Sequence, residues 1–367
     1  MKIVTKVPGK LILLGEYAVL EGSSALVMTV NRFAKVIFTS SGTMTFTLQA
    51  PSIGIKNLPF SINARGEVDF LTRLPQKITR KVNFFLSIFE FGIQLLKRSG
   101  KFIVPSEILL ETHEFFHHNR TAKLGLGSSA ALSVAVTASL LAQGSQTPPN
   151  FDEIFQMALQ AHRVAQGNVG SGIDIAASVY GGVLCYKREP DSDHFKTEAV
   201  SLSVPEQLFM LPVWVGKSSS TSQLVKLFYQ FKFQNQKKYL SFIDEMKYVA
   251  NIGCRAFKEK NISEFLASVK QYNKLMKKLG EEIDAPIISK EHQKMTEIAT
   301  EMGIAYKPSG AGGGDIGVCF SESPALFAEL NKEIHEAGFE PLDLTYEPHG
   351  LQIELKEVKA CEDVTYS

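Results

Sequence analysis

A short segment rich in glycine and serine, residues 123–129, runs directly into a stretch at 130–141 that is apolar on nearly every side of a helix. This pattern is typical of a buried helix. The first turn of a helix leaves backbone N–H groups without intrahelical partners and carries the positive end of the helix dipole. Because glycines also let an anion approach the backbone closely, the segment predicts a phosphate site at a fixed helix start.

The segment matches neither G-x-x-x-x-G-K-[ST] nor G-x-G-x-x-G, two common glycine-rich nucleotide motifs. Ser128 or Ser129 could also act simply as the N-cap of the helix. Two other glycine-rich segments, 167–174 and 307–315, lie far along the chain, and each contains a polar side chain suited to a ligand. Together the three segments favour a binding site over three unrelated turns.

The chain length and composition limit the class of protein. With 367 residues the chain is longer than one hydrophobic core usually supports, so we expect two domains, at 1–190 and 191–367. Its 39 basic and 38 acidic side chains nearly cancel, which gives no reason to expect nucleic acid or a membrane as partner. The four cysteines show no C-x-x-C spacing and the first residues lack the apolar core of a secretory signal, so we expect reduced thiols and a cytoplasmic protein.

Hydrophobic periodicity predicts strands at 3–7 and 10–14, with a turn at Pro8 and Gly9 between them. Further along, the same reasoning predicts strands at 25–39, 43–48, 108–112, 211–215 and 316–320, helices at 80–97, 152–165 and 324–337, several helices between 223 and 303, and a last pair of strands at 342–346 and 351–355. The C-terminal elements are expected to complete a small α+β unit.

Two charged residues stand in mostly apolar surroundings. Lys10 lies at a predicted strand edge, where its ammonium needs a counter-charge or a ligand unless it reaches the surface like most lysines. Asp174 follows the second glycine segment among small and apolar residues, so it must be paired, hydrogen-bonded or bound to a metal, and a helix N-cap would satisfy it equally well. Both are candidates for a catalytic site.

Two further segments could bind an anion. A run of hydroxyl side chains at 218–222 follows Lys217, and it could bind phosphate or only cap the next helix. The third glycine segment has four glycines at 310–314, more than a turn requires, and exposes backbone N–H groups.

Three motifs, at 8–17, 125–131 and 309–315, resemble the ordered motifs of the small-molecule kinase family named for galactokinase, homoserine kinase, mevalonate kinase and phosphomevalonate kinase. The resemblance spans nearly the whole chain. It implies an α+β fold with an N-terminal domain like ribosomal protein S5 and a C-terminal ferredoxin-like domain with a helical insertion. It also implies ATP and Mg²⁺ bound between the two domains.

Within this family, residues 162–181, 15–20 and 214–217 are most similar to phosphomevalonate kinases. A mevalonate kinase is expected to have a magnesium-binding glutamate at about the position of His162, and imidazole is a poor ligand for Mg²⁺. The resemblance therefore implies ATP-dependent phosphorylation of mevalonate 5-phosphate in isoprenoid biosynthesis, with mevalonate kinase or another kinase of the family as the alternative. Asn168 departs from the pattern, because eukaryotic-type sequences have lysine there.

Two functions of other classes are disfavoured. A non-catalytic metabolite sensor need not retain Lys10, Ser129 and Asp174, and a diphosphomevalonate decarboxylase is expected to have an arginine near the catalytic aspartate, whereas 170–177 has none.

The resemblance also implies roles for individual residues. Lys10 would stabilise charge at the transferring group, Asp174 would orient or deprotonate the acceptor, and Ser129 would bind the metal. The residues assigned to ATP are Lys123, Gly125, Leu126, Gly127, Ser128, Ser129 and Ala130. The candidates for binding the substrate are Ser171, Lys217, Ser220, Thr221, Ser309, Gly310, Ala311 and Gly312. A monomer or a homodimer is expected.

Overall fold

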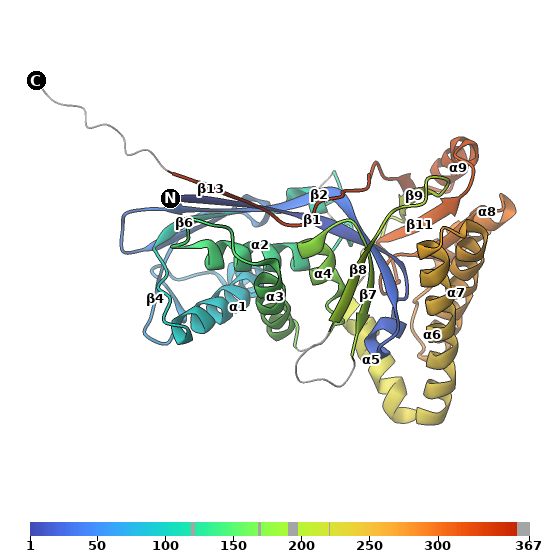
Figure 1. The fold of residues 1–367 in the computed structure, drawn as a ribbon, viewed down its shortest axis with the longest axis horizontal. Helices are drawn as coiled ribbons and strands as arrows, with labels where there is room; N and C mark the ends of the chain where they lie inside the picture. Colours follow the sequence, from blue (N-terminus) through green and yellow to red (C-terminus); the bar gives the residue numbers. More distant parts are fainter. Residues whose placement is uncertain (119–121, 168–169, 190–196, 220, 358–367) are drawn as a thin grey trace, which may run out of the picture.

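The computed structural model of the chain describes residues 1–118, 122–167, 170–189, 197–219 and 221–357 (Figure 1). Within these residues, nine strands form one large sheet in the order β13-β1-β2-β6-β3-β4-β5, with β7 paired to β2 and β8 to β7. Its strands are β1 (Lys2–Leu14), β2 (Ala25–Ser40), β3 (Phe46–Ala50), β4 (Ile55–Ile62), β5 (Val68–Phe70), β6 (Ser106–Glu111), β7 (Val183–Arg188), β8 (Thr197–Leu202) and β13 (Gln352–Lys356).

Helices cover one face of this sheet (Figure 1). They are α1 (Gln76–Arg98), α2 (Ser128–Ala142), α3 (Phe151–Ala165) and α4 (Ile173–Tyr180). All residues of α2 from Ser133 onward are buried, which confirms the buried helix predicted from its apolar sequence. The Thr5 hydroxyl lies 3.2 Å from the carbonyl oxygen of Ala135, so β1 and α2 are also joined by a polar contact. The glycine-rich segment therefore ends at a helix that the core holds firmly.

The predicted turn at Pro8 and Gly9 is wrong, because β1 continues through both residues. Its pairing with β2 shifts register between Pro8 and Gly9, so the irregularity is a β-bulge and not a reversal of the chain. A Cβ atom at Gly9 would lie 2.8 Å from Phe115 and 2.9 Å from the Leu126 carbonyl oxygen. Glycine is needed here for close packing and not for a turn.

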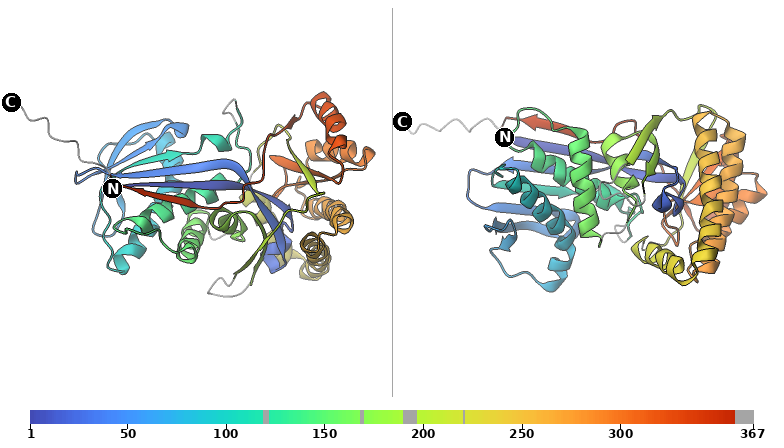
Figure 2. Two further views of the ribbon diagram at one scale, coloured as in Figure 1. Left: turned by 45° about the horizontal axis from the view of Figure 1, so that its top comes forward. Right: turned by 60° about the horizontal axis from the view of Figure 1, so that its bottom comes forward.

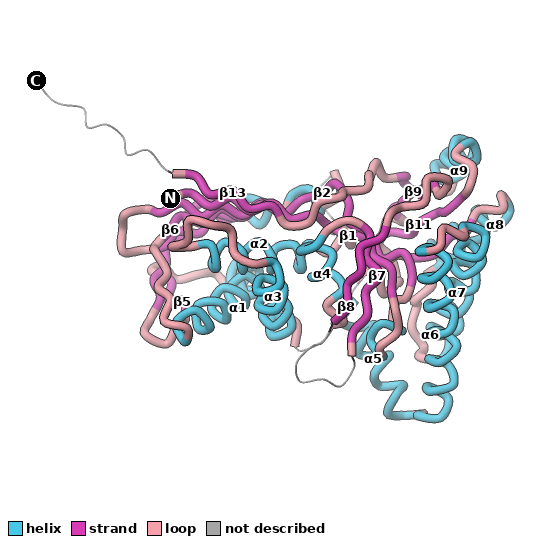
Figure 3. The backbone as a smooth tube through the Cα atoms, in the orientation of Figure 1, coloured by secondary structure: helices cyan, strands magenta, loops and turns pink. Residues whose placement is uncertain are grey.

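A second sheet has the order β10-β11-β9-β12 (Figure 2). Its strands are β9 (Phe209–Trp214), β10 (Ala305–Pro308), β11 (Ile316–Ser321) and β12 (Glu340–Pro341). The helices of this half are α5 (Thr221–Gln234), α6 (Gln236–Lys258), α7 (Ile262–Glu282), α8 (Lys290–Glu301) and α9 (Ala325–Glu336). Short 3-10 helices lie at η1 (Ala18–Glu21), η2 (Pro51–Ile53) and η3 (His113–Phe115). Helices and strands thus occur in both halves, which confirms the predicted α+β class (Figure 3).

Of the last two predicted strands, only the one at 351–355 is confirmed, as β13, whereas 342–346 forms no strand and contributes only a bridge from Tyr346 to Val30. β12 pairs with β9 in the small sheet, whereas β13 returns to the large sheet and pairs with β1. β8 also joins the large sheet, through β7. The two sheets therefore do not divide the chain at residue 190, and the domain ranges 1–190 and 191–367 stay a prediction.

Two further expectations concern cysteines and membranes. Cys185, Cys254 and Cys319 are free thiols, as predicted, and Cys361 lies outside the described residues. Among the residues described, no helix combines the length and the apolar character needed to cross a bilayer.

Candidate active site

The glycine loop before α2 packs closely against two charged side chains. Gly125 and Gly127 have φ angles of 76° and 80°, and α2 begins directly after Gly127. A Cβ atom at Gly127 would lie 3.1 Å from Lys10 Cε, and one at Gly125 would lie 2.6 Å from Asp315 Cβ. The N-cap of α2 is Gly127 and it makes no side-chain cap, so neither Ser128 nor Ser129 is the N-cap.

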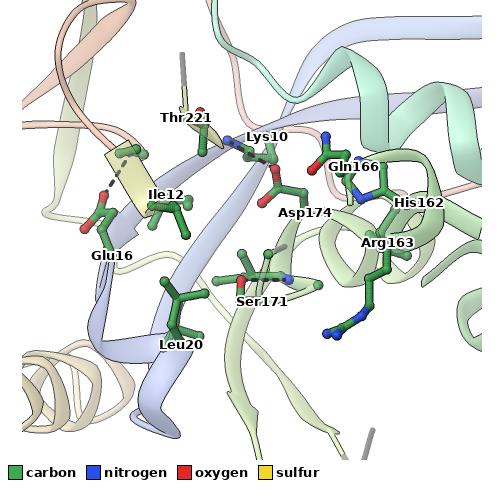
Figure 4. Close-up of a pocket in the computed structure, with 18 of the residues that line it drawn as sticks. Lys10, Ile12, Glu16, Leu20, His162, Arg163, Gln166, Ser171, Asp174 and Thr221 are labelled. Atoms are coloured by element: carbon green, nitrogen blue, oxygen red, sulfur yellow. Dashed lines mark hydrogen bonds and ion pairs between the residues drawn. The ribbon is translucent and has the colours of Figure 1, made fainter. Parts of the chain in front are cut away.

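Lys10 and Asp174 face each other in a cavity beside this loop (Figure 4). Lys10 Nζ lies 3.8 Å from Asp174 Oδ2, and only 7% of the Lys10 side chain is exposed, so Lys10 is not a surface lysine. The backbone N–H of Lys10 donates to the Leu126 carbonyl at 2.9 Å, which ties β1 to the glycine loop. Asp174 is in the first turn of α4 but the N-cap is Gly172, so its carboxylate is not used as a cap.

Ser129 lies next to two polar side chains, one on α3 and one at the residue that caps its C-terminus. His162 Nε2 and Gln166 Nε2 are each 3.4 Å from the Ser129 hydroxyl oxygen. Burial lowers the pKa of His162, and the negative charge of Asp174 opposes this shift. The imidazole is therefore neutral at pH 7 and can orient the hydroxyl without adding a charge.

The third glycine segment closes another side of the cavity. Gly310 and Ala311 line it, and Ser309 Oγ accepts a hydrogen bond of 2.8 Å from the Ile12 backbone. Tyr17 donates a hydrogen bond of 2.6 Å to the Ala311 carbonyl. Gly312 does not line the cavity. It packs against the backbone of Ile287, where an added Cβ atom would lie 2.3 Å from the carbonyl oxygen.

The remaining predicted residues are only partly brought together. Ser171 and Thr221 line the same cavity as Lys10, whereas the side chains of Lys123 and Lys217 are exposed and do not line it. Ser220 lies outside the described residues, as does Asn168.

Sequence reasoning missed a buried ion pair beside the cavity. The Lys307 ammonium donates to the Glu16 carboxylate, and the two side chains are 0% and 2% exposed. The same carboxylate accepts a hydrogen bond of 3.1 Å from the Gly310 backbone. Burial lowers the pKa of Lys307, and Glu16 opposes this shift. The sequence does show that Glu16 and Lys307 each lie near apolar residues, but it does not show that the two side chains contact each other.

Three other charged groups were not predicted. Arg163 of α3 lines the cavity, and Figure 4 shows its side chain extending away from His162 and Asp174. Arg188 donates a hydrogen bond of 3.1 Å to the carbonyl of Gly170, another residue of the lining. Asp315 lies against Gly125, and burial raises its pKa to about 6, although Lys10 and Lys123 act in the opposite direction.

A glycine loop at the start of a buried helix touches Lys10, which faces a carboxylate across a cavity, and this arrangement suits the class of small-molecule phosphotransferases on an α+β scaffold. Comparison with known proteins agrees with this class. Residues 94–182 match the family described as GHMP kinases N terminal domain. This match identifies residues 94–182 as a GHMP kinase N-terminal domain.

The similar proteins include kinases with two different acceptors in their names. A phosphomevalonate kinase of Streptomyces sp. (strain CL190) is 27% identical, over 95% of this chain and 98% of that protein. A mevalonate kinase of Aeropyrum pernix is 31% identical, but over 49% of each chain.

Solved structures share the fold over nearly the whole chain. The Lin0012 protein from Listeria innocua has a TM-score of 0.83 at 27% identity and covers 96% of this chain and 99% of that one. The Streptococcus pneumoniae phosphomevalonate kinase in complex with phosphomevalonate and AMPPNP has a TM-score of 0.75 at 19% identity, with 94% and 99% covered. The second similarity supports the fold alone.

Proposed function

We propose that this protein is a phosphomevalonate kinase, which transfers the terminal phosphoryl group of ATP to the phosphate of mevalonate 5-phosphate and produces mevalonate 5-diphosphate and ADP. The observation that carries the proposal is the Lys10–Asp174 pair at 3.8 Å, in a cavity lined by both residues, together with the packing of the Lys10 side chain against Gly127 of the glycine loop. A relative aligned over almost its full length, from Streptomyces, bears this name.

Lys10 is the proposed catalytic cation. Phosphoryl transfer asks a protein mainly to position the reactants and to stabilise negative charge. Because the Lys10 side chain is buried, its charge acts through a medium of low dielectric constant. An acceptor phosphate has a second pKa of about 6 and is mostly a dianion at neutral pH, so a strong base is not required. Asp174 then orients Lys10 and the acceptor.

The glycine loop and the first turn of α2 are the proposed site for the ATP phosphates. Their fit rests on the positive φ angles of Gly125 and Gly127, which favour glycine, and on the close packing of Gly125, where a Cβ atom would lie 2.6 Å from Asp315 Cβ. Magnesium, when bound, would neutralise phosphate charge, and the Ser129 hydroxyl is our candidate ligand because it is an oxygen donor. His162 and Gln166 would hold that hydroxyl in place.

We expect Gly125→Ala to raise the Kd for AMPPNP at least about tenfold, because the new methyl group would displace Asp315 or the loop. Gly144→Ala is the matched control, since Gly144 has a similar φ of 75° and nothing within 4 Å of its added Cβ. Calorimetric titration of both variants with the nucleotide analogue checks this. Equal affinities of the two variants would show that the glycine loop does not bind the nucleotide.

Arg163 is our candidate for binding the carboxylate of the substrate. Mevalonate 5-phosphate carries a second anionic group, so the cavity needs a cation besides Lys10. Arg163 lines the cavity and extends away from Asp174, while Ser171, Thr221, Gly310 and Ala311 offer hydrogen-bonding groups along its walls. Arg188 holds the Gly170 carbonyl next to this end of the cavity.

We expect Arg163→Ala to raise KM for mevalonate 5-phosphate by about 10- to 100-fold, the value of a lost charge-assisted hydrogen bond, with KM for ATP unchanged. Arg255→Ala, which removes an arginine paired with Glu264 on the exposed surface, is the control and should leave both constants unchanged. Steady-state kinetics with each substrate varied in turn measures the effect. An unchanged KM for mevalonate 5-phosphate would mean that another residue binds the substrate carboxylate.

Mevalonate kinase is the second candidate, because an Aeropyrum pernix enzyme of that name matches about half of the chain. The direct test is ADP release from ATP with mevalonate 5-phosphate, mevalonate, galactose and homoserine offered separately. We expect turnover with mevalonate 5-phosphate alone. Turnover with mevalonate and none with its phosphate would favour the second candidate. A cytoplasmic location and a monomeric or homodimeric state stay predictions.

A further inference from the structure

Two adjacent histidines lie on the segment that leads into the glycine loop. This segment folds back on itself, since Phe116 pairs with Lys123 in an isolated bridge and the His117 N–H donates to the Ala122 carbonyl at 2.9 Å. His117 and His118 follow η3 on its first arm. The second arm leads to Gly125.

Both imidazoles meet a carboxylate of the small sheet. His117 Nε2 lies 2.7 Å from Glu340 Oε2, and His118 Nδ1 lies 3.8 Å from Glu340 Oε1. The three ligand atoms all lie within 4.8 Å of one another, and no other group of this kind occurs in the described part of the chain. Glu340 begins β12, so the cluster joins the large-sheet half of the fold to the small sheet.

The fold buries the side chain of His117 and fixes the backbone of Glu340. The His117 ring is 6% exposed and stacks on Trp214, with centroids 4.1 Å apart and an angle of 24°. Trp214 is the residue paired with Glu340 across β9 and β12. The His118 ring lies 3.9 Å from that of His117, and its side chain is 73% exposed. The cluster thus has a rigid inner side and an outer side open to water.

The donor set selects a class of cation. Two imidazole nitrogens and a carboxylate suit Zn²⁺ and similar transition metals, whereas Mg²⁺ prefers oxygen donors. Ligand bonds of about 2.0–2.1 Å in a tetrahedral site separate the ligand atoms by roughly 3.4 Å. The two histidine–carboxylate separations, 2.7 and 3.8 Å, lie on either side of that value, so small side-chain rotations would complete the geometry.

We propose that His117, His118 and Glu340 bind one Zn²⁺-class ion, with the fourth position open to water. The ion would join the segment preceding the glycine loop to the small sheet. This site is separate from the Lys10–Asp174 cavity and does not depend on which acceptor the kinase uses.

Titration of the full chain, without a polyhistidine tag and after chelator treatment, with Co²⁺ in excess Mg²⁺ tests the proposal. The visible absorption of Co²⁺ should saturate near one equivalent, and Zn²⁺ should displace it. His118→Ala, at an exposed position that folding does not need, should weaken binding at least about tenfold, as should Glu340→Gln. His349→Ala is the control, because His349 pairs with Glu347 at 3.2 Å without a second histidine, and it should bind Co²⁺ like the wild type.

Thermal unfolding gives an independent measurement. Zn²⁺ should raise the Tm of the wild type and of the His349→Ala variant, and it should leave that of His118→Ala unchanged. Absence of saturable Co²⁺ binding, or equal affinity in the wild type and His118→Ala, would show that the His117–Glu340 contact is only a hydrogen bond and would overturn the proposal.

Discussion

Lys10→Met is expected to lower kcat by about 10³-fold or more, because it removes the buried positive charge proposed to stabilise the transferring phosphoryl group. Methionine has similar length and suits an apolar strand, so the fold should tolerate it. Stopped-time assays of ADP formation with saturating mevalonate 5-phosphate and ATP measure the loss.

The control for this substitution is Lys6→Met. Lys6 is an exposed residue of the same strand, with its ammonium 3.7 Å from the centre of the Phe33 ring, and its loss should leave kcat unchanged. Asp174→Asn should have a milder effect than Lys10→Met, because a phosphate acceptor needs no strong base. Wild-type activity in the Lys10→Met variant would refute the catalytic assignment.

Lys307→Met is expected to lower the free energy of unfolding by about 3–5 kcal/mol, because it leaves the Glu16 carboxylate buried without its ammonium partner. The double variant Glu16→Gln with Lys307→Met should recover most of this loss, since no unpaired charge stays buried. Urea unfolding followed by circular dichroism gives the free energies.

Lys332→Met provides the comparison with an exposed pair. Lys332 and Glu336 are 3.8 Å apart with side chains 75% and 61% exposed, so breaking this pair should change stability by less than about 1 kcal/mol. If Lys307→Met were no more destabilising than Lys332→Met, the buried Lys307–Glu16 pair would not stabilise the contact between β10 and the segment that follows β1.

Local sequence patterns were sufficient to predict the buried helix and to single out two charged residues of the candidate site. The apolar run after Ser128 predicted a buried helix, and α2 is buried along nearly its whole length. The polar residues Lys10 and Asp174 were singled out because each stands among apolar neighbours, and the structure brings them within 3.8 Å. Their roles in catalysis stay predictions until the variants are measured.

Long-range pairing could not be predicted in the same way. Pro8 and Gly9 resemble a turn locally, but pairing with β2 and the close approach of Phe115 keep the strand continuous. Glu16 and Lys307 are 291 residues apart, and only the folded chain shows that they satisfy one another. β13 likewise finds its partner at the opposite end of the chain.

The nature of the acceptor atom is the central claim, and ³¹P NMR of the product formed from ATP and mevalonate 5-phosphate tests it most directly. Transfer to the acceptor phosphate should produce two mutually coupled resonances of a diphosphate ester together with those of ADP. Two uncoupled phosphomonoester resonances would mean transfer to a hydroxyl group and would contradict the proposal.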